Sequence, residues 1–473
     1  MLFGGAAAAQ PATVDSSTDP APAPADPASP AKPVSADDVR DAPKPGQEHG
    51  RLDPLDLGDG VGRWIGRVLL FPVRVPMFIV AQPVRGALYL QDRFYAAETI
   101  AALFYTEDKK LAIFPTVLVE TGFGLNGGVR IQLKDLFGQG EKIRARGGYG
   151  GRFRQVATLD IDSGEAFGPR VSAGIDMRYE LRASERFSGI GNNELETSMD
   201  RRDPVDPLGV ATRYRMTVLR ASPRVRLELP QNLWVTGTGA VIDKNYEQLE
   251  DADGSDRPIQ EIYDPASIPG FIDGTRFLYT ELEVAWDTRR PSHWLDPKGV
   301  WGTGGLVLAY AGRQAGLDDG ATFYRIGVDL QRFLRFGPGP RVLELRGYAE
   351  LVTGDREHVP FTELPRLGGV DLLRGYTTDR YRDRFAAVAQ VNYLWMLSRY
   401  LGAVGFVDAG RVSNGVNAFT FEDLRVGFGG ALEAYSSSGL LLRAQLATSI
   451  DGGITAFVSL DPVFGARSRV ERY

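Results

Sequence analysis

The chain has 473 residues, a formal net charge of -6, 56 glycines and no cysteine. The mild acidity and the lack of a basic cluster argue against a nucleic-acid partner, and the lack of cysteine excludes disulfides and thiolate metal sites. No apolar run reaches the roughly 18 residues that a membrane-spanning helix needs. This does not exclude a membrane β-barrel, because barrel strands give a weaker hydropathy signal.

The chain begins with two segments that we do not expect to fold. Residues 1–10 read MLFGGAAAAQ and resemble the end of a secretory signal peptide, with cleavage near Ala9. Residues 11–50 are rich in Pro, Ala and Asp and have too few large apolar residues to offset the entropy of ordering. We therefore predict a signal-peptide remnant followed by a disordered linker.

Residues 51–110 have a different pattern, in which apolar residues recur at a loosely helical spacing with charged and amide side chains between them. From Pro83 onward the apolar set is Val84, Leu88, Leu90, Phe94, Ile100, Leu103 and Phe104. This spacing predicts a short helical segment. It either packs on the periplasmic mouth or inside the barrel predicted below, or lies on the membrane as an interfacial helix.

From residue 111 onward the hydrophobic period changes to two, which predicts strands. Leu278, Leu282 and Trp286 lie on one face of such a strand, and Tyr279, Glu281 and Glu283 lie on the other. A soluble sheet hides its apolar face in a core, whereas a membrane barrel turns it outward to lipid. A soluble protein of this size would usually be built from smaller repeated units, and the sequence has no repeat of fixed period.

The number of strands favours the barrel. We expect about sixteen strands over residues 111–464, followed by an extension at 465–473. They fall near 111–121, 125–135, 140–150, 152–162, 169–182, 211–222, 232–243, 276–287, 299–311, 322–334, 341–351, 385–397, 400–411, 423–435, 440–450 and 453–464. An even number is typical of bacterial outer-membrane barrels. The fold class is therefore all-β, a transmembrane antiparallel barrel with a short N-terminal helical segment.

The lengths of the connections agree with this interpretation. Those at 183–210, 244–275 and 352–384 are long, and each follows an odd-numbered strand. Most connections after even-numbered strands are short. Outer-membrane barrels have long external loops and short periplasmic turns. The connection at 352–384 follows the eleventh strand, so it is expected to be the sixth external loop.

Four motifs then resemble the Omp85 superfamily of outer-membrane barrels. Leu373-Arg374-Gly375-Tyr376 is similar to the (V/I)RG(F/Y) motif of that family's sixth external loop, and Phe406, Asp408 and Gly410 match its FxDxG strand motif. The turn Asp287-Thr288-Arg289 is similar to its DTR turn, and residues 186–192 (RFSGIGN) resemble its F-x-G-x-G-N segment. The resemblance covers roughly 111–464, and its C-terminal strand resembles the family's β-signal.

Chemistry assigns a partner to Arg374. A guanidinium folded into the lumen needs a carboxylate, because an unpaired buried charge is costly. Asp408 shares its strand face with Gly402 and Gly410 and should point inward. We expect a bidentate pair between Arg374 and Asp408 that holds the loop in place.

The sequence also departs from the family. Many relatives carry a glutamate near the position of Asn392, and family members usually have N-terminal POTRA domains, for which we find no room. Tyr381-Arg382-Asp383-Arg384 is a run of charge, read either as a solvated loop end or as a cluster that faces lipopolysaccharide.

The resemblance implies an outer-membrane protein that inserts or assembles outer-membrane proteins, or translocates polypeptides or lipids. Its expected partners are outer-membrane lipids including lipopolysaccharide, unfolded outer-membrane proteins or a periplasmic partner. A passive channel or porin and a structural barrel that displays its loops remain alternatives. No enzyme is expected, because His49, His293 and His358 lack a neighbouring nucleophile motif, and no cofactor or metal motif stands out.

Overall fold

The computed structural model describes most of the chain from residue 110 to residue 460. The described residues are Phe104, Thr106, Asp108, 110–192, 211–250, 256–291, 300–317, 320–335, 341–397, 401–436 and 439–460. Contacts divide the chain into 1–48 and 49–473, and all described residues belong to the second unit. The predictions for 1–10, 11–50, nearly all of 51–110 and 465–473 therefore lie outside the described residues.

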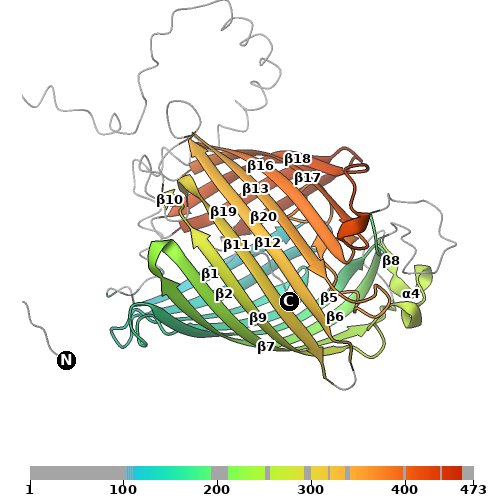
Figure 1. Ribbon diagram of the computed structural model, residues 1–473, viewed down its shortest axis with the longest axis horizontal. Coiled ribbons are helices and arrows are strands. Elements are labelled where there is room, and N and C mark those ends of the chain that lie inside the picture. The colour runs from blue at the N-terminus through green and yellow to red at the C-terminus, as the bar shows by residue number, and fades with distance from the viewer. Residues whose placement is uncertain are drawn as a thin grey trace, which may run out of the picture. The chain divides into compact units, whose positions relative to one another are not determined.

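Sixteen long antiparallel strands form a closed barrel, as predicted (Figure 1). They are β1 (Leu111–Glu120), β2 (Gly124–Lys134), β3 (Lys142–Gly150), β4 (Phe153–Asp162), β5 (Val171–Phe187), β6 (Thr212–Leu229), β7 (Leu233–Glu247), β9 (Thr275–Asp287), β11 (Trp301–Gly316), β12 (Phe323–Arg335), β13 (Arg341–Val352), β16 (Phe385–Met396), β17 (Leu401–Ser413), β18 (Arg425–Ser436), β19 (Gly439–Ser449) and β20 (Ile454–Leu460). Each long strand pairs with the next along the chain, and β1 pairs with β20 to close the ring.

The remaining described elements are short and belong to the connections. They are η1 (Pro230–Asn232), β8 (Arg257–Pro258), α4 (Ile259–Ile262), η2 (Pro265–Ser267), β10 (Arg290–Pro291), β14 (Arg366–Leu367), β15 (Tyr381–Arg382) and η3 (Val416–Ala418). Among the described residues, no helix is both long and apolar enough to cross a bilayer.

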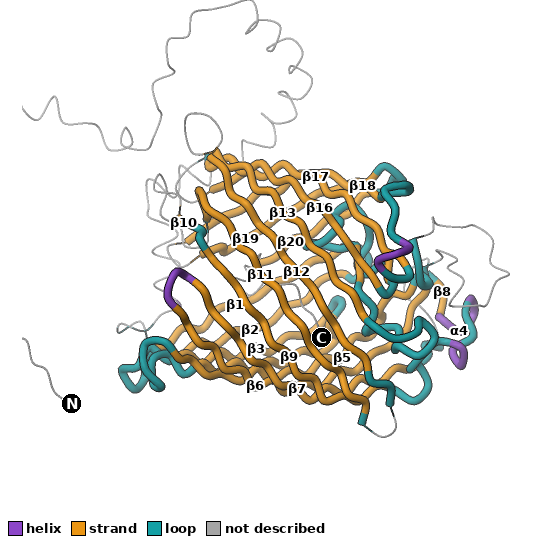
Figure 2. Tube along the Cα trace, in the orientation of Figure 1, coloured by secondary structure: helices purple, strands orange, loops and turns teal. Residues whose placement is uncertain are grey.

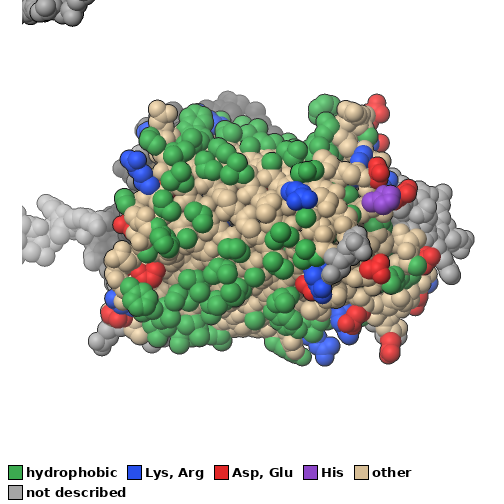
Figure 3. All heavy atoms as spheres, turned by 60° about the horizontal axis from the view of Figure 1, so that its bottom comes forward, with side chains coloured by type: hydrophobic (Ala, Val, Ile, Leu, Met, Phe, Trp, Pro, Cys, Tyr) green, Lys and Arg blue, Asp and Glu red, His purple; other side chains and the backbone are tan. Residues whose placement is uncertain are grey.

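The side chains alternate across the barrel wall in the sense expected for a membrane barrel. Along β9, Glu281 and Glu283 are buried toward the lumen, while Leu278, Leu282 and Trp286 are exposed on the outside. Figure 3 shows hydrophobic side chains across the middle of the outer surface and charged side chains mainly toward the two ends. The apolar face of the sheet thus points away from the protein, which indicates that it contacts the hydrocarbon of a bilayer.

The two ends of the barrel differ as the loop lengths predict. The long connections follow β5, β7 and β13, and β8 and α4 lie at that end, opposite to β10 (Figure 1). The odd-side connections after β1 and β3 are short, so only some external connections are long. Strands β5 and β6 extend further than predicted, to Phe187 and Leu229, with a register shift between Arg182 and Glu185.

The long external loops share an apolar core of the kind found in soluble proteins. It gathers buried side chains from several loops and strand ends, among them Phe187, Tyr214, Phe271 and Phe361. The rings of Phe187 and Phe361 meet edge to face with centroids 5.3 Å apart. Figure 2 shows loop segments within the ring of strands near this end. The core fixes the position of the sixth loop, which carries the candidate site.

The direction of the barrel wall can be tested with one outward residue. Leu282, 56% exposed, should tolerate Leu282→Arg poorly, since arginine near the bilayer midplane of a barrel costs about 2–4 kcal/mol. Unfolding from lipid vesicles by denaturant measures this cost. The matched control is Ile272→Arg, because Ile272 is equally exposed, at 59%, but lies in an external loop. Equal stability of the two variants would contradict a lipid-facing position for Leu282.

Candidate functional site

The sixth external loop, residues 353–384, turns back into the barrel as a hairpin. Its arms pair at β14 and β15, and its tip carries Leu373 to Tyr376. The tip is a tight turn in which Gly369 N donates to Tyr376 O (3.1 Å). Leu373 has a φ of 55° and Gly375 a φ of 98°. A buried leucine in this left-handed region is strained, so its surroundings must hold the tip firmly in place.

The predicted pair between Arg374 and Asp408 is present. Arg374 Nε donates to Asp408 Oδ2 at 2.8 Å and Nη2 donates to Oδ1 at 2.5 Å, which makes the pair bidentate. The backbone N–H of Arg374 donates to the same carboxylate at 2.8 Å. Both side chains are almost fully buried. One carboxylate therefore fixes both the charge and the backbone of the loop tip.

Two further contacts hold the guanidinium. Its Cζ lies 3.7 Å from the centroid of the Phe406 ring, a cation–π contact with the first residue of the FxDxG motif. Its Nη2 donates to Asn392 Oδ1 at 2.6 Å, and Asn392 Nδ2 donates in turn to Glu344 Oε2 at 3.0 Å. Glu344 is the register partner of Asn392 on the next strand. The network thus has a second carboxylate, that of Glu344, on the strand next to the one that carries Asn392. Asn392 links this carboxylate to Arg374.

Glycines in the wall allow the tip to lie flat on it. A Cβ on Gly427 of β18 would stand 1.7 Å from Arg374 O, and a Cβ on Gly375 would stand 2.2 Å from Thr448 O. Neither contact is physically allowed, so both positions require glycine. Gly375, with its positive φ, lets the backbone turn, and its missing side chain permits the close approach.

Tyr376, the last residue of the motif, bridges to the end of the barrel. Its hydroxyl donates to Asp451 Oδ2 at 2.7 Å, in the connection between β19 and β20. Its ring packs edge to face on Tyr381, with centroids 5.3 Å apart. The motif residue Leu373 is completely buried among loop and wall residues. All four predicted motif residues therefore contact the inner wall or the hairpin.

The expectation that residues 381–384 form a solvated loop end is wrong for the first three of them. Tyr381, Arg382 and Asp383 are buried. Arg382 lies between the rings of Phe187 and Phe361, at 5.1 and 5.6 Å from their centroids. These residues face the loop core, so they do not form a cluster that faces lipopolysaccharide.

A second anchor of the loop was not predicted. The buried carboxylate of Glu363 accepts hydrogen bonds from Lys244 and from Gln314 Nε2 (2.6 Å), and its backbone O accepts from Arg325 Nη2 (2.7 Å). Burial alone would raise the pKa of Glu363, but the charges of Lys244 and Arg325 outweigh burial and lower the pKa to about 2. The partners lie on β7, β11 and β12, so no local sequence pattern could reveal them.

A third anchor lies at the end of the hairpin. Asp379 accepts from Arg366 Nη1 at 2.7 Å and from Arg152 Nη2 at 3.4 Å. Burial opposes ionisation here too, but the same two guanidinium groups hold the pKa of Asp379 at about 2. Loop six is thus pinned by three separate carboxylates, each matched to buried cations.

The segment after β5 that resembles F-x-G-x-G-N covers the loop from outside. Phe187 and Ile190 enter the loop core, and Gly191 N donates to Arg382 O at 2.8 Å. Asn192 then receives a hydrogen bond from Arg425 Nη2 on β18, at 2.7 Å to its backbone O. This segment therefore crosses the lumen and braces loop six against the opposite wall.

The DTR turn has a local structural role at the other end. Arg289 Nε and Nη2 donate to Asp287 Oδ1 and Oδ2 at 2.9 and 2.7 Å, and the Arg289 Cζ lies 4.6 Å from the Trp301 ring centroid. Asp287 and Arg289 thus form a bidentate pair that shapes the turn between β9 and β11. The pair lies at the opposite end of the barrel from the long loops.

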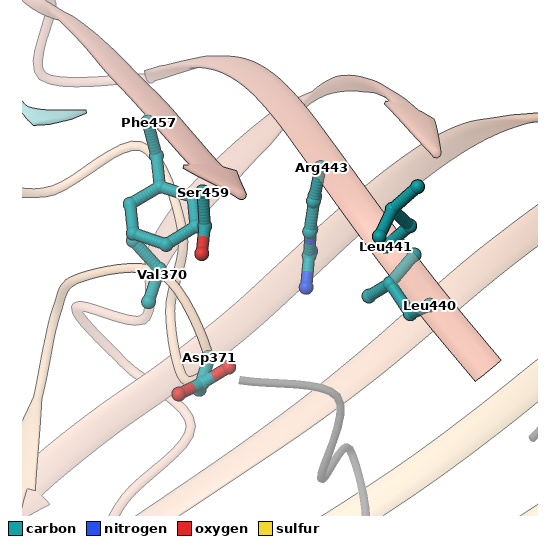
Figure 4. A pocket seen from close by; sticks show the side chains of 7 residues that line it. All are labelled: Val370, Asp371, Leu440, Leu441, Arg443, Phe457 and Ser459. Atoms are coloured by element: carbon teal, nitrogen blue, oxygen red, sulfur yellow. The ribbon is translucent and has the colours of Figure 1, made fainter. Parts of the chain in front are cut away.

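A small hollow lies beneath the loop tip, on the inner face of the last two strands (Figure 4). Its lining residues are Val370, Asp371, Leu440, Leu441, Arg443, Phe457 and Ser459. Figure 4 shows Arg443 and Asp371 pointing toward it from β19 and from loop six. The hollow places loop six next to the strand that closes the barrel.

No catalytic arrangement is evident around the described histidine. His358 has a largely exposed side chain, and its nearest acidic partner, Asp355, is 3.9 Å away. His49 and His293 lie outside the described residues. In the part of the chain that the structure describes, no group of His, Cys, Asp or Glu could hold a metal ion.

Comparison with known families decides the identity of the barrel. A family model described as the Omp85 superfamily domain matches residues 135–453. The chain belongs to the Omp85 superfamily. Its closed sixteen-strand ring is therefore an Omp85 barrel, located in the outer membrane of a Gram-negative bacterium. A search of the curated proteins found no match.

Solved structures with related folds are distant in sequence. BamA of Haemophilus ducreyi lacking POTRA domains 1–3 is 13% identical with a TM-score of 0.49, and the match covers 74% of this chain and 69% of that one. CdiB of Acinetobacter baumannii is 13% identical with a TM-score of 0.45, covering 74% and 60%. CdiB of Escherichia coli is 10% identical with a TM-score of 0.46, covering 74% and 62%. The chain spans less than two thirds of either CdiB chain.

Asp408→Asn tests the first anchor. The neutral amide leaves Arg374 buried without its charge partner, which typically costs about 3–5 kcal/mol for a buried pair. We expect loop six to loosen and to be cut faster by an external protease. Asp243→Asn is the matched control, because the pair between Asp243 and Arg276 lies at the surface and is worth little. Identical digestion of all three proteins would contradict the anchor.

Acid should release the anchors at Glu363 and Asp379. Their pKa values are lowered to about 2 from ordinary values of 4.5 and 3.8, so their stabilisation is complete above about pH 4.5 and is lost as the pH falls through about 2. A spin label at Glu357→Cys, an exposed position of loop six, should stay constrained from pH 7 to about 4.5 and become mobile toward pH 2. A label whose mobility is unchanged at pH 2 would exclude this electrostatic docking.

Proposed function

We propose that this Omp85 barrel inserts or assembles outer-membrane proteins, or translocates polypeptides or lipids, by opening between its first and last strands. The proposal rests on the superfamily to which the chain belongs and on one feature of its closure. The ladder between β1 and β20, which we call the seam, joins the first strand of the ring to the last. Among the described residues it pairs Val117–Glu120 with Phe457–Leu460.

On its other side, β1 pairs with β2 over ten residues, from Leu111 to Glu120. Pro115, in the middle of β1, has no N–H, and the alternation of bonding directions along the strand places the missing donor on the β20 side. An unpaired strand edge is a template for another strand, and strand addition gives affinity through main-chain hydrogen bonds. This supports a mechanism in which an incoming strand of an unfolded outer-membrane protein pairs with β1.

The contents of the lumen favour the seam over an axial pore. The three anchors and the shared apolar core fix loop six within the external part of the lumen. A passive channel or porin, the main alternative, would need a water-filled path past this loop. The superfamily gives no reason to expect an enzyme, and the exposed His358 offers no catalytic partner.

Locking the seam tests the proposal, and the absence of native cysteine makes the test clean. Leu118 and Ser459 are buried register partners across the seam, so Leu118→Cys with Ser459→Cys should form a disulfide. In a deletion strain complemented with this variant, oxidation should lower the content of assembled outer-membrane proteins or lipids severalfold, and reductant should restore it.

The matched control locks a ladder on the far side of the ring. Ala285 and Leu308 are buried register partners of β9 and β11, and a disulfide between Ala285→Cys and Leu308→Cys should leave outer-membrane content unchanged. Full complementation by the oxidised seam variant would refute opening at the seam. Ion conductance that survives the lock in the same preparation would support the channel alternative.

A further inference from the structure

Loop six crosses the inner wall of the barrel in a single short stretch, residues 374–379. Arg374 bonds to Asp408 on β17, and Gly375 lies against the backbone of Thr448 on β19. Tyr376 then bonds to Asp451, in the connection that leads into β20. Up to this point, every contact with the wall is on the C-terminal side of the seam.

The next contacts are on the other side of the seam. The Thr378 hydroxyl donates a hydrogen bond to Oε1 of Glu120, which is the last residue of β1. Asp379 bonds to Arg152, in the connection between β3 and β4. Glu120 is the register partner of Phe457 in the last rung of the seam. The stretch 374–379 therefore spans the seam from within, at its external end.

The external end of the seam also has further hydrogen bonds of its own. Thr121 extends the pairing by one residue beyond β1: its N–H donates to Ala456 O at 3.0 Å, and Ala456 N donates back to Thr121 Oγ1 at 2.7 Å. Side chain and backbone together therefore close this end with two added hydrogen bonds.

A proline weakens the periplasmic half. Lys134 N on β2 donates to Lys110 O, whereas Thr121 N donates to Ala456 O on β20. Because the bonding direction alternates along a strand, even-numbered residues of β1 bond toward β2 and odd-numbered residues toward β20. Pro115 is odd-numbered, so the N–H that it lacks is one that would face β20. The β1–β2 ladder loses nothing.

We propose that residues 374–379 are a strap that holds the external end of the seam closed, with the hydrogen bond from Thr378 to Glu120 as its releasable contact. The strap rests on the proposed function in one respect: the seam that it holds is the one that the proposed mechanism opens. Opening then starts on the periplasmic side, where Pro115 offers β20 no N–H, and stops at the strap.

The contacts of the strap with β17 and with β1 are unequal. Arg374 and Asp408 form a bidentate ion pair with a third bond from the backbone, whereas Thr378 offers Glu120 one neutral hydroxyl. Arg152 lies 3.9 Å from the Glu120 carboxylate, so this carboxylate still has a cation beside it when Thr378 moves away. The strap therefore releases from β1 first and stays attached to β17.

Disulfide trapping measures the closed seam directly. In purified full-length protein that carries Leu118→Cys and Ser459→Cys, a brief oxidation should cross-link most of the chain. Adding Thr378→Val, which removes the hydroxyl, should lower the cross-linked fraction at least threefold. Thr378→Ser restores the hydroxyl and should restore cross-linking, which shows that a low yield is not a folding failure.

Thr362→Val is the matched control within the same loop. It removes a buried hydroxyl that bonds to Tyr246 at 2.6 Å, and Tyr246 lies on β7, away from the seam. Cross-linking of this variant should equal that of the parent. The strap is overturned if Thr378→Val cross-links like the parent, if Thr378→Ser fails to restore the yield, or if Thr362→Val lowers it equally. No client is needed, so this outcome is separate from the complementation test of the proposed function.

Discussion

The constraint on which this structure depends is that hydrocarbon offers no hydrogen bonds. A sheet in a bilayer must therefore close on itself, so that each backbone group finds a partner in a neighbouring strand. Closure turns the apolar face outward and leaves polar side chains, such as Glu281 and Glu283, in the lumen. The polar and charged side chains of the lumen then need water or partner groups, and here loop six supplies many of these partners.

Loop six is held in the lumen by buried ion pairs as well as by apolar packing. Asp408, Glu363 and Asp379 are each surrounded by cations or hydrogen-bond donors, and each makes its contacts with a different set of residues. Breaking one such pair leaves a buried charge without compensation, which is why a buried pair is costly to disrupt although it contributes little net stability. Three pairs together specify one docked position of the loop rather than a range of positions.

Much of this could be predicted from the sequence, and the limits have physical causes. The period of two located all sixteen strands, and the parity of Asp408 along β17 placed it correctly opposite Arg374. The anchor at Glu363 and the role of Glu344 were missed, because each depends on register between strands, which a single strand pattern does not contain. The run 381–384 was misread because charged residues look solvated until distant partners such as Arg356 are known.

The seam shows how one barrel can meet two opposed requirements. Complete pairing would protect β1 and β20 from lipid but would leave no edge for another strand. Pro115 removes a donor on the side that faces β20 alone, so the barrel keeps the whole β1–β2 ladder while the seam loses one hydrogen-bond donor. A seam with fewer donors is easier to open. The bond between Thr378 and Glu120 counters this at the external end, so the loop motif that pins Arg374 also limits how far the first strand can move.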